Sequence, residues 1–333
     1  MSMIKLIVEP SPHIRSKNTS DRIMAKVLIA LTPALAMSVY IFGPRALLMC
    51  AICVLSCTVF DVAYLRIFRK DTNFDLSPAV TGLLLAFNLP VTLPIYIAVI
   101  GCFVAIIPVK QLFGGLGQNF ANPAITARIV LLLSFSVQMT HWVEPFYYRT
   151  ANAADAITSA TPLAIAAEGV NATETMPGLV DLILGFHGGS LGETSAFALL
   201  IGFVFLVCTR VIRSITPLAF IGTVAVGAFA MGADVGVQVF SGGLILGAVY
   251  MATDYPTTPI SLTGKFVFGV GCGLITLAIR FFAEMPEGVS FAILIMNIVT
   301  FYIDKITIPR VFGAVAKPFK LPFLTRKGGN DER

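Results

Sequence analysis

Residues 46–65 read ALLMCAICVLSCTVFDVAYL, a run that contains one charged side chain, Asp61. A helix of about 20 residues is long enough to cross a hydrocarbon core of roughly 30 Å. Similar apolar runs recur between Met24 and Tyr302. They are long and continuous, whereas the strands of a membrane barrel alternate apolar and polar residues over about ten positions. The pattern therefore predicts an all-α protein whose helices span a membrane.

The composition of the whole chain agrees with this prediction. Of its 333 residues, 56% are hydrophobic and 12% are charged, and the mean hydropathy is +0.86. Soluble domains carry about 25% charged residues, and a soluble fold of this size could not enclose so much apolar surface. The net charge of +5 comes from basic residues scattered between the apolar runs. We therefore expect contact with membrane lipid and none with nucleic acid.

Cysteine and histidine give no sign of a disulfide framework or a metal site. All six cysteines fall within apolar runs, where paired disulfides are not expected. The three histidines, His13, His141 and His187, lack the spacing of metal ligands. We expect no bound metal.

About ten spans are predicted. Prolines 90 and 94 separate the third span from the fourth, so one of the two is expected to be short or interrupted. The close spacing of the sixth to eighth runs leaves a count of nine open. The predicted spans lie near residues 24–42, 46–65, 77–93, 94–112, 123–139, 196–212, 215–232, 235–252, 266–283 and 288–304.

The basic residues predict the orientation of these spans. If the N-terminus is cytoplasmic, the inner segments contain 19 of the 23 lysines and arginines, as expected for cytoplasmic loops. The outer segments keep Arg45, Arg149 and Arg280, and Arg128 falls within the fifth span. Both termini are therefore predicted to be cytoplasmic.

The longest connection, residues 140–195, divides the spans into two sets of five. Such a 5+5 arrangement is expected of two membrane halves related as inverted repeats. Apolar stretches near 162–167 and 179–186 indicate that this outer loop is folded. The chain thus divides into a cytoplasmic segment (1–23), a first membrane half (24–139), the outer loop (140–195), a second membrane half (196–304) and a basic cytoplasmic tail (305–333).

The outer loop contains the sequence DAITSATPL at residues 155–163. Pro162 disfavours a helical conformation at Thr161 and suits the first position of a following helix. Thr161 is therefore predicted to be an N-cap, with its hydroxyl beside free backbone N–H groups. A phosphate attached to that hydroxyl would meet the same N–H groups and the positive end of the helix dipole. Local physics alone favours an ordinary Thr-Pro helix start without a bound phosphate.

The segment from Asp155 to Thr161 resembles the Asp-x-x-(Ser/Thr)-Gly-Ala-Thr sequence at which flavin transferases esterify FMN to threonine. Thr158, Ala160 and Thr161 follow that pattern, and Ser159 replaces its glycine. Three further segments resemble the NqrB/RnfD family of ion-translocating electron-transfer complexes, in the family's order. They are SPHIRS at 11–16, GGLGQNFANPA at 114–124 and MATD at 251–254.

This resemblance covers about residues 9–310 and implies a function. It implies a flavoprotein subunit of a bacterial inner-membrane complex that moves Na⁺ or H⁺ while electrons pass between ferredoxin and NAD. It also implies FMN on Thr161 at the outer face, maturation by a flavin transferase and assembly with Rnf subunits A, B, C, E and G. The chain would be part of a redox-driven translocase and not catalytic alone. Likeness to NqrB further suggests a second, non-covalent flavin, riboflavin.

Other candidate residues lie at or near the ends of spans. Irregular backbone around Gly115, Gln118, Asn119 and Asn122 indicates a second cofactor site, an ion path or a tight structural connection. Arg128 and Asp254 are ionisable groups at or near membrane depth, which are functional candidates unless they reach the interface. Two alternative functions stay open: a solute channel or transporter without a redox cofactor, and a structural subunit that has lost its flavin.

Overall fold

All regular elements in the described residues are helices. The computed structural model describes residues 19–69, 75–149, 160–168, 176–193, 195–283 and 288–307. The first half contains α1 (Ser20–Phe42), α2 (Pro44–Tyr64) with a π-helical extension Leu65–Arg69, α3 (Ser77–Phe87), α4 (Ile95–Val104) with a π-helical extension Ala105–Gln111, and α5 (Pro123–Ser134). The loop contains α6 (Ser136–Met139), a 3₁₀ turn (Tyr147–Arg149), α7 (Pro162–Glu168) and α8 (Leu179–Leu184). The second half contains α9 (Ala196–Cys208), α10 (Ile215–Ala230), α11 (Val235–Phe240), α12 (Leu244–Leu246) with a π-helical extension Gly247–Met251, α13 (Leu262–Phe282) and α14 (Val289–Thr307).

Four helices in the described residues are long and apolar enough to cross a membrane, namely α1, α2 with its extension, α13 and α14. Five further apolar helices are shorter. Every predicted span contains at least one of these helices or, for the eighth span, the short helices α11 and α12. The prediction of a polytopic helical membrane protein is therefore confirmed, and the loop helices α7 and α8 begin at residues 162 and 179 as expected.

The third span is shorter than predicted. α3 ends at Phe87, and residues 88–93 are irregular instead of helical to residue 93. The Asn88 side chain donates to the Leu84 carbonyl at 2.6 Å. Arg45 donates to the carbonyls of Val91 (2.9 Å) and Thr92 (3.2 Å). Side chains therefore satisfy carbonyl groups around this interruption, a requirement at membrane depth.

The eighth span is interrupted, so the prediction of one continuous helix over 235–252 is wrong. α11 ends at Phe240, and helical structure resumes at Leu244. Between them Gly242 and Gly243 have φ of 70° and 66°. Two successive residues in this left-handed region end a right-handed helix, and glycine enters it without steric cost.

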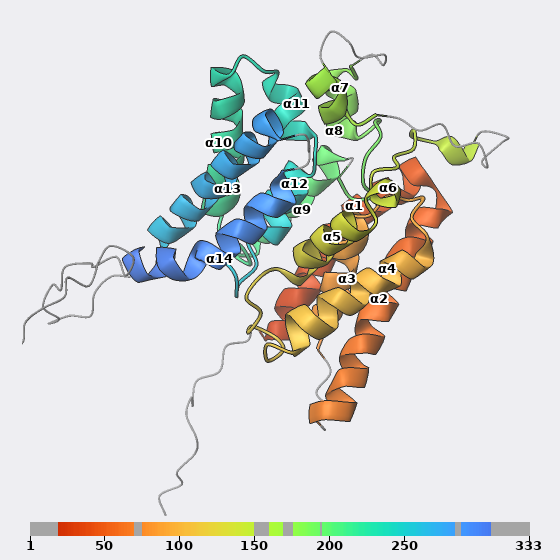
Figure 1. The fold of residues 1–333 in the computed structure, drawn as a ribbon, viewed down its shortest axis with the longest axis vertical. Coiled ribbons are helices and arrows are strands. Elements are labelled where there is room, and N and C mark those ends of the chain that lie inside the picture. The colour runs from red at the N-terminus through yellow and green to blue at the C-terminus, as the bar shows by residue number, and fades with distance from the viewer. Residues whose placement is uncertain are drawn as a thin grey trace, which may run out of the picture.

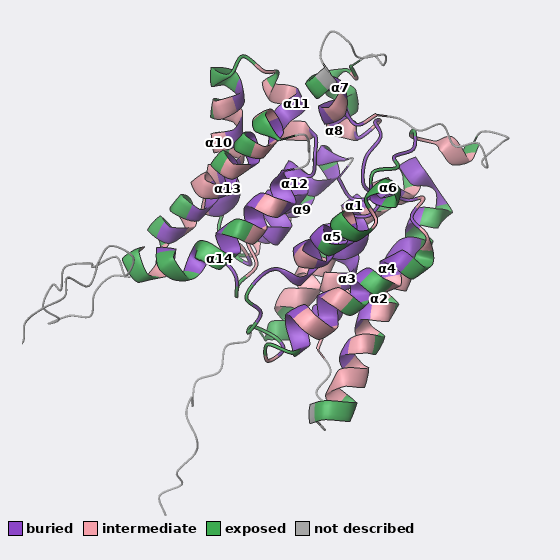
Figure 2. Ribbon diagram, viewed as in Figure 1, coloured by how far each residue is buried: buried purple, intermediate pink, exposed green. Residues whose placement is uncertain are grey.

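The helices form two groups with a common core. α2 packs against α3 and α4, and α10 packs against α13, while α1 contacts α9 and α5 contacts α14 across the two groups. In Figure 1, α7 and α8 lie beside α11 at one end of the molecule. Figure 2 shows that α12 is buried, whereas exposed residues concentrate on the outer faces and ends of the helices.

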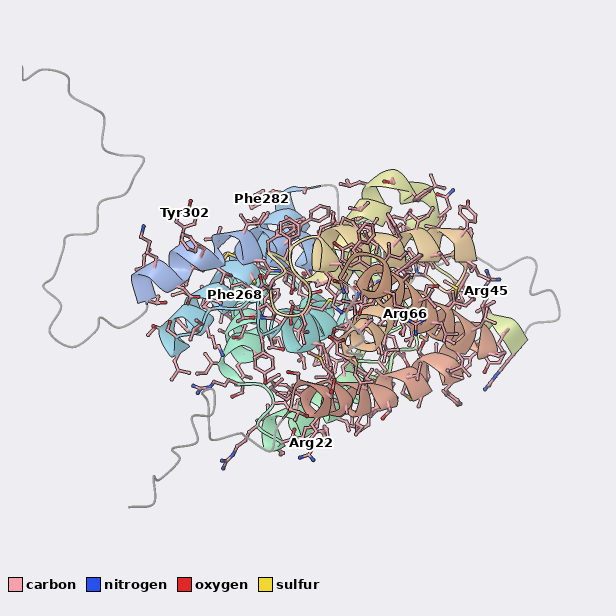
Figure 3. The ribbon with its side chains drawn as sticks, turned by 90° about the horizontal axis from the view of Figure 1, so that it is seen from below. Arg22, Arg45, Arg66, Phe268, Phe282 and Tyr302 are labelled. Atoms are coloured by element: carbon pink, nitrogen blue, oxygen red, sulfur yellow. The ribbon has the colours of Figure 1, made fainter. Side chains whose placement is uncertain are left out.

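The outer faces present large apolar side chains. Phe282 and Tyr302, labelled in Figure 3, are 82% and 49% exposed, whereas Phe268 is fully buried. A soluble monomer rarely exposes so much contiguous apolar surface. This distribution is the one expected of a bundle surrounded by lipid tails.

Candidate cofactor sites

Thr161 is the N-cap of α7, as predicted. Its hydroxyl oxygen accepts a hydrogen bond from the backbone N–H of Ala164 at 3.3 Å, and its carbonyl accepts from Ile165 at 3.0 Å. Thr161 is 7% exposed. Ala160 is also described, whereas Asp155, Thr158 and Ser159 of the predicted attachment motif lie outside the described residues.

α7 is held against the interrupted helix of the second half. Leu163 of α7 packs with Leu182 of α8 and with Val237 and Phe240 of α11. A Cβ atom on Gly242 would lie 2.1 Å from Leu163 Cδ1. Gly242 is therefore needed for two reasons: its backbone has a positive φ, and a side chain at this position would displace Leu163 of α7. This packing fixes the position of the Thr161 hydroxyl relative to the membrane bundle.

Three of the predicted residues line one cavity at the other end of the bundle. Asn119, Asn122 and Asp254 surround a space of about 240 Å³. Asn122 caps α5 by accepting from the N–H groups of Ala124 (3.0 Å) and Ile125 (3.3 Å). Its amide nitrogen also donates to the Met251 carbonyl at 3.3 Å. The cavity is otherwise mostly apolar, with walls that include Val80, Leu84, Leu206 and Val249.

Asp254 is the carboxylic acid among the described residues that line this cavity. The residue is partly exposed, but its carboxyl is withdrawn from water. Burial raises the pKa of the Asp254 carboxyl from 3.8 to about 6, against the opposing effect of hydrogen bonds from the Asn119 side chain and the Tyr255 N–H. The carboxyl can therefore take up or release a proton near neutral pH.

The remaining predicted residues do not line this cavity. Gly115 is buried at the turn after α4, with φ of 93°, and Gln118 is exposed and packs against Gly114. Both belong to the tight connection between α4 and α5. The structural interpretation of this segment thus holds for Gly115 and Gln118, while Asn119 and Asn122 belong to the cavity.

Arg128 lies apart from the cavity, where the two helix interruptions meet. Its guanidinium donates to Asn88 Oδ1 at 2.9 Å and to Ser290 Oγ at 3.1 Å. A Cβ atom on Gly243 would lie 3.9 Å from Arg128 Nη1 and 3.5 Å from Glu193 Oε2. Arg128 and Glu193 are 4% and 5% exposed. The arginine therefore links α5 to both interrupted helices within the protein interior and does not reach the interface.

Glu193 was not predicted from the sequence as a residue of interest. It belongs to residues 187–193, which are all buried although they come from the outer loop. Leu191 and Gly192 donate to the carbonyls of Leu89 (3.1 Å) and Phe87 (2.9 Å), so this segment pairs with the interruption after α3. The available signal was the small-residue run HGGSLG at 187–192 directly before a span.

A buried ion pair beside the cavity was not predicted either. Lys110 Nζ lies 2.9 Å from Asp61 Oδ1 and 3.8 Å from Asp75 Oδ1, and Gln111 donates to Asp61 at 2.6 Å. In the sequence, Lys110 served only as a marker of the cytoplasmic side. It lies in a π-helical turn, a distortion that is frequent at functional sites.

Comparisons with known proteins agree with this architecture. Residues 7–313 match the sequence model of the NQR2, RnfD, RnfE family. The chain is 44% identical over 316 residues to the D subunit of the Na(+)-translocating ferredoxin:NAD(+) oxidoreductase complex of Acetobacterium woodii, a match that covers 94% of this chain and 97% of that protein. It is 38% identical over 320 residues to the D subunit of the proton-translocating ferredoxin:NAD(+) oxidoreductase complex of Clostridium ljungdahlii, with 92% and 96% covered. Identity to the D subunit of the ion-translocating oxidoreductase complex of Stutzerimonas stutzeri is 37% over 345 residues, with 93% and 98% covered.

Proposed function

Because this chain belongs to the NQR2, RnfD, RnfE family, we propose that it is the D subunit of an ion-translocating ferredoxin:NAD⁺ oxidoreductase complex. Its relatives of that name include a Na⁺-translocating and a proton-translocating complex, so the coupling ion is one of these two. The subunit acts in the bacterial inner membrane with Rnf subunits A, B, C, E and G. Binding of ferredoxin and NAD⁺ belongs to those partners.

The redox role in this proposal is carried by FMN esterified through its phosphate to Thr161. The observation that supports it is the N-cap: the hydroxyl predicted as the acceptor starts α7 and is positioned by the packing of Leu163 on α11. An ester oxygen can still accept the hydrogen bond from Ala164. FMN supplies one- and two-electron chemistry, while the protein fixes its distance to the next carrier.

The cavity of Asn119, Asn122 and Asp254 suits a second, uncharged flavin, and we propose riboflavin. Amide and carboxyl groups at a mostly apolar wall match a flat ring with polar edges. Lys110, the basic residue among the described residues of the cavity wall, is already paired with Asp61. The lining therefore offers no spare cation for a phosphate, which favours riboflavin over a second FMN.

The two proposed flavins lie at opposite ends of the interrupted helix. Gly242 meets Leu163 of α7 on one side, and Val249 and Tyr250 line the cavity on the other. Residues 235–251 therefore connect the two proposed flavin sites within the bundle. Arg128 lies beside Gly243 of this segment. It is part of the proposed ion path, or it stabilises the interrupted helices.

A denaturing gel tests the covalent flavin. The chain is expressed with a flavin transferase, separated and viewed under ultraviolet light, and its intact mass is measured. The wild type is expected to fluoresce. Thr161→Asn is expected to fold but stay dark, because asparagine is a good N-cap and cannot form the phosphoester. Thr161→Ser is expected to keep both the cap and the flavin.

Thr140→Ala, a change in the same outer region outside the motif, is the control and is expected to fluoresce. A dark wild-type band of unmodified mass would refute the covalent flavin and leave the channel or the flavin-free subunit as the function. Fluorescence in Thr161→Asn would instead show attachment at another residue.

A further inference from the structure

A second cavity, of about 280 Å³, shares Tyr255 with the lining of the first and is lined by three basic residues. Arg210 and Arg213 belong to the connection between α9 and α10, and Lys265 to the first turn of α13. The distribution of basic residues along the chain assigns this end of the bundle to the cytoplasm. The polar residues of the proposed riboflavin site line only the first cavity, and the walls that the two cavities share are Val211, Ile212, Thr253 and Tyr255.

The three cations form no ion pair within 4.0 Å in the described part of the chain, where the salt bridges are those of Lys110. Arg213 and Lys265 repel each other, and Asp304 is the acid that partly offsets Lys265. The Asp304 carboxylate also accepts from the Ile260 N–H at 3.0 Å. Three positive charges thus face one cavity with one nearby negative charge, an arrangement that favours an anionic ligand.

The connection that contributes the arginines is fixed in position. Val211 donates to the Leu206 carbonyl at 3.0 Å, and the Tyr255 hydroxyl donates to the Val211 carbonyl. Arg210 has φ of 54°, a conformation that residues other than glycine adopt at a cost. The fold therefore holds the backbone that presents Arg210 and Arg213, while both residues are exposed.

The helix ends that contribute to this cavity also carry exposed apolar side chains. Leu218 of α10 and Leu262 and Phe266 of α13 are 58%, 48% and 56% exposed, and Ile260 in the cavity wall is 79% exposed. α10 and α13 pack side by side, so exposed apolar side chains of both helices lie in the same part of the bundle as the cavity. An anion bound here would have apolar surface next to it for attached hydrocarbon chains.

We propose that Arg210, Arg213 and Lys265 bind the phosphate of an anionic phospholipid from the cytoplasmic leaflet, with its acyl chains against α10 and α13. Basic pockets between helices on the cytoplasmic side suit such headgroups. The exposed apolar side chains favour a lipid over free phosphate, which would gain nothing from them. This proposal does not depend on either of the proposed flavins.

Native mass spectrometry of the purified full-length chain in detergent tests this proposal, with phosphatidylglycerol as the probe and phosphatidylcholine as the uncharged-headgroup comparison. The wild type is expected to retain phosphatidylglycerol selectively. Arg213→Gln and Lys265→Gln are each expected to weaken its binding about tenfold, as for loss of one charged hydrogen bond. Arg213→Lys keeps the charge and is expected to recover part of the affinity.

Arg66→Gln removes an exposed cation at the same end of the bundle, outside this cavity, and is expected to leave binding unchanged. Equal weakening in Arg66→Gln would mean general attraction to the basic surface and would overturn the proposal. Displacement of the lipid by millimolar inorganic phosphate would replace it with a free-anion site. Lipid present on the isolated chain but absent from the assembled complex would make the cavity a subunit contact. A single size-exclusion peak for each variant excludes misfolding as the cause.

Discussion

At the residue scale, the raised pKa of Asp254 has a consequence for stability. In the unfolded chain this carboxyl has the ordinary value of 3.8, whereas in the folded protein its pKa is about 6. The folded state therefore binds the proton more tightly. The stability from this group is fully present below about pH 4 and is lost as the pH rises through 6.

Asp254→Asn removes this dependence. The variant is expected to be more stable than the wild type above pH 7, by at most about 3 kcal/mol for a shift of two pKa units, and equally stable near pH 4. Thermal unfolding in detergent between pH 4.5 and 8 measures the difference. A constant difference across this range would mean that Asp254 does not titrate there.

The residue scale is also where the sequence was most and least informative. Thr161 precedes a proline, and the local rule for Pro at the first helical position correctly predicted it as an N-cap. Asn122 also precedes a proline and caps α5. Lys110 and Glu193 were not predicted. Lys110 is important because it pairs with Asp61, which is 49 residues away in the chain. Glu193 is important because residues 187–193 insert into the bundle and bond to the segment after α3. Neither relation leaves a local pattern.

At the element scale, a substitution of Gly242 tests whether the interrupted helix holds α7 in place. A Cβ atom at Gly242 would clash with Leu163 Cδ1 at 2.1 Å and Arg280 Nη2 at 2.8 Å. Gly242→Ala is expected to destabilise the chain by about 1–3 kcal/mol through overpacking, beyond the backbone cost of φ 70°. It is also expected to reduce flavin attachment at Thr161, because Leu163 holds α7.

Gly232 offers a matched control for that substitution. It has φ of 71°, and a Cβ atom there would meet nothing within 4 Å. Gly232→Ala therefore has the same backbone cost without the clash. The difference in melting temperature and in flavin fluorescence between the two variants therefore measures the effect of the clash with α7, separately from the backbone cost. If the two variants behave alike, Leu163 does not depend on the interruption.

The buried pair Lys110–Asp61 joins α2 to the π-helical end of α4 and gives a second test at this scale. Lys110→Met leaves Asp61 charged and buried, with Gln111 as a remaining donor. Loss of one partner of a buried pair costs about 3–5 kcal/mol. Lys110→Met is expected to fall near that range, and Lys110→Met with Asp61→Asn to recover most of the loss. Thermal unfolding of the wild type, both single variants and the double variant provides the cycle. Equal losses in the single and the double variant would argue against a buried charge pair.

Hydropathy predicted the number of apolar segments but not their interruptions. Residues 241–243, SGG, lie within a run that is otherwise apolar, and a window of about 20 residues averages over them. Either the third or the fourth span was expected to be short or interrupted, because prolines 90 and 94 separate them. The eighth has no proline. Its interruption lies at Gly242 and Gly243, whose backbone is close to α7, Arg280 and Glu193.

At the scale of the whole molecule, the two groups of helices correspond in order. The third member of each group is the interrupted one: α3 with residues 88–93 in the first, and α11 with α12 in the second. The first members, α1 and α9, contact each other, and so do the fifth, α5 and α14. Such pairing is expected of inverted repeats. The repeat relation stays a prediction, because no residue-level repeat accompanies it.

Two halves related as inverted repeats would not by themselves decide which face of the bundle lies outside the cell. The orientation is therefore tested directly. Gln138, on α6, and Gln118, in the connection before α5, are both exposed and lie beyond opposite ends of α5. In a chain with Cys208, the exposed native thiol, changed to serine, each glutamine is replaced by cysteine. A membrane-impermeant maleimide is expected to label Gln138→Cys on intact spheroplasts and Gln118→Cys only after lysis. Labelling in the reverse order would place α7 and Thr161 in the cytoplasm. It would also separate Thr161 from a transferase that works outside and leave 19 of 23 basic residues in segments that must be translocated.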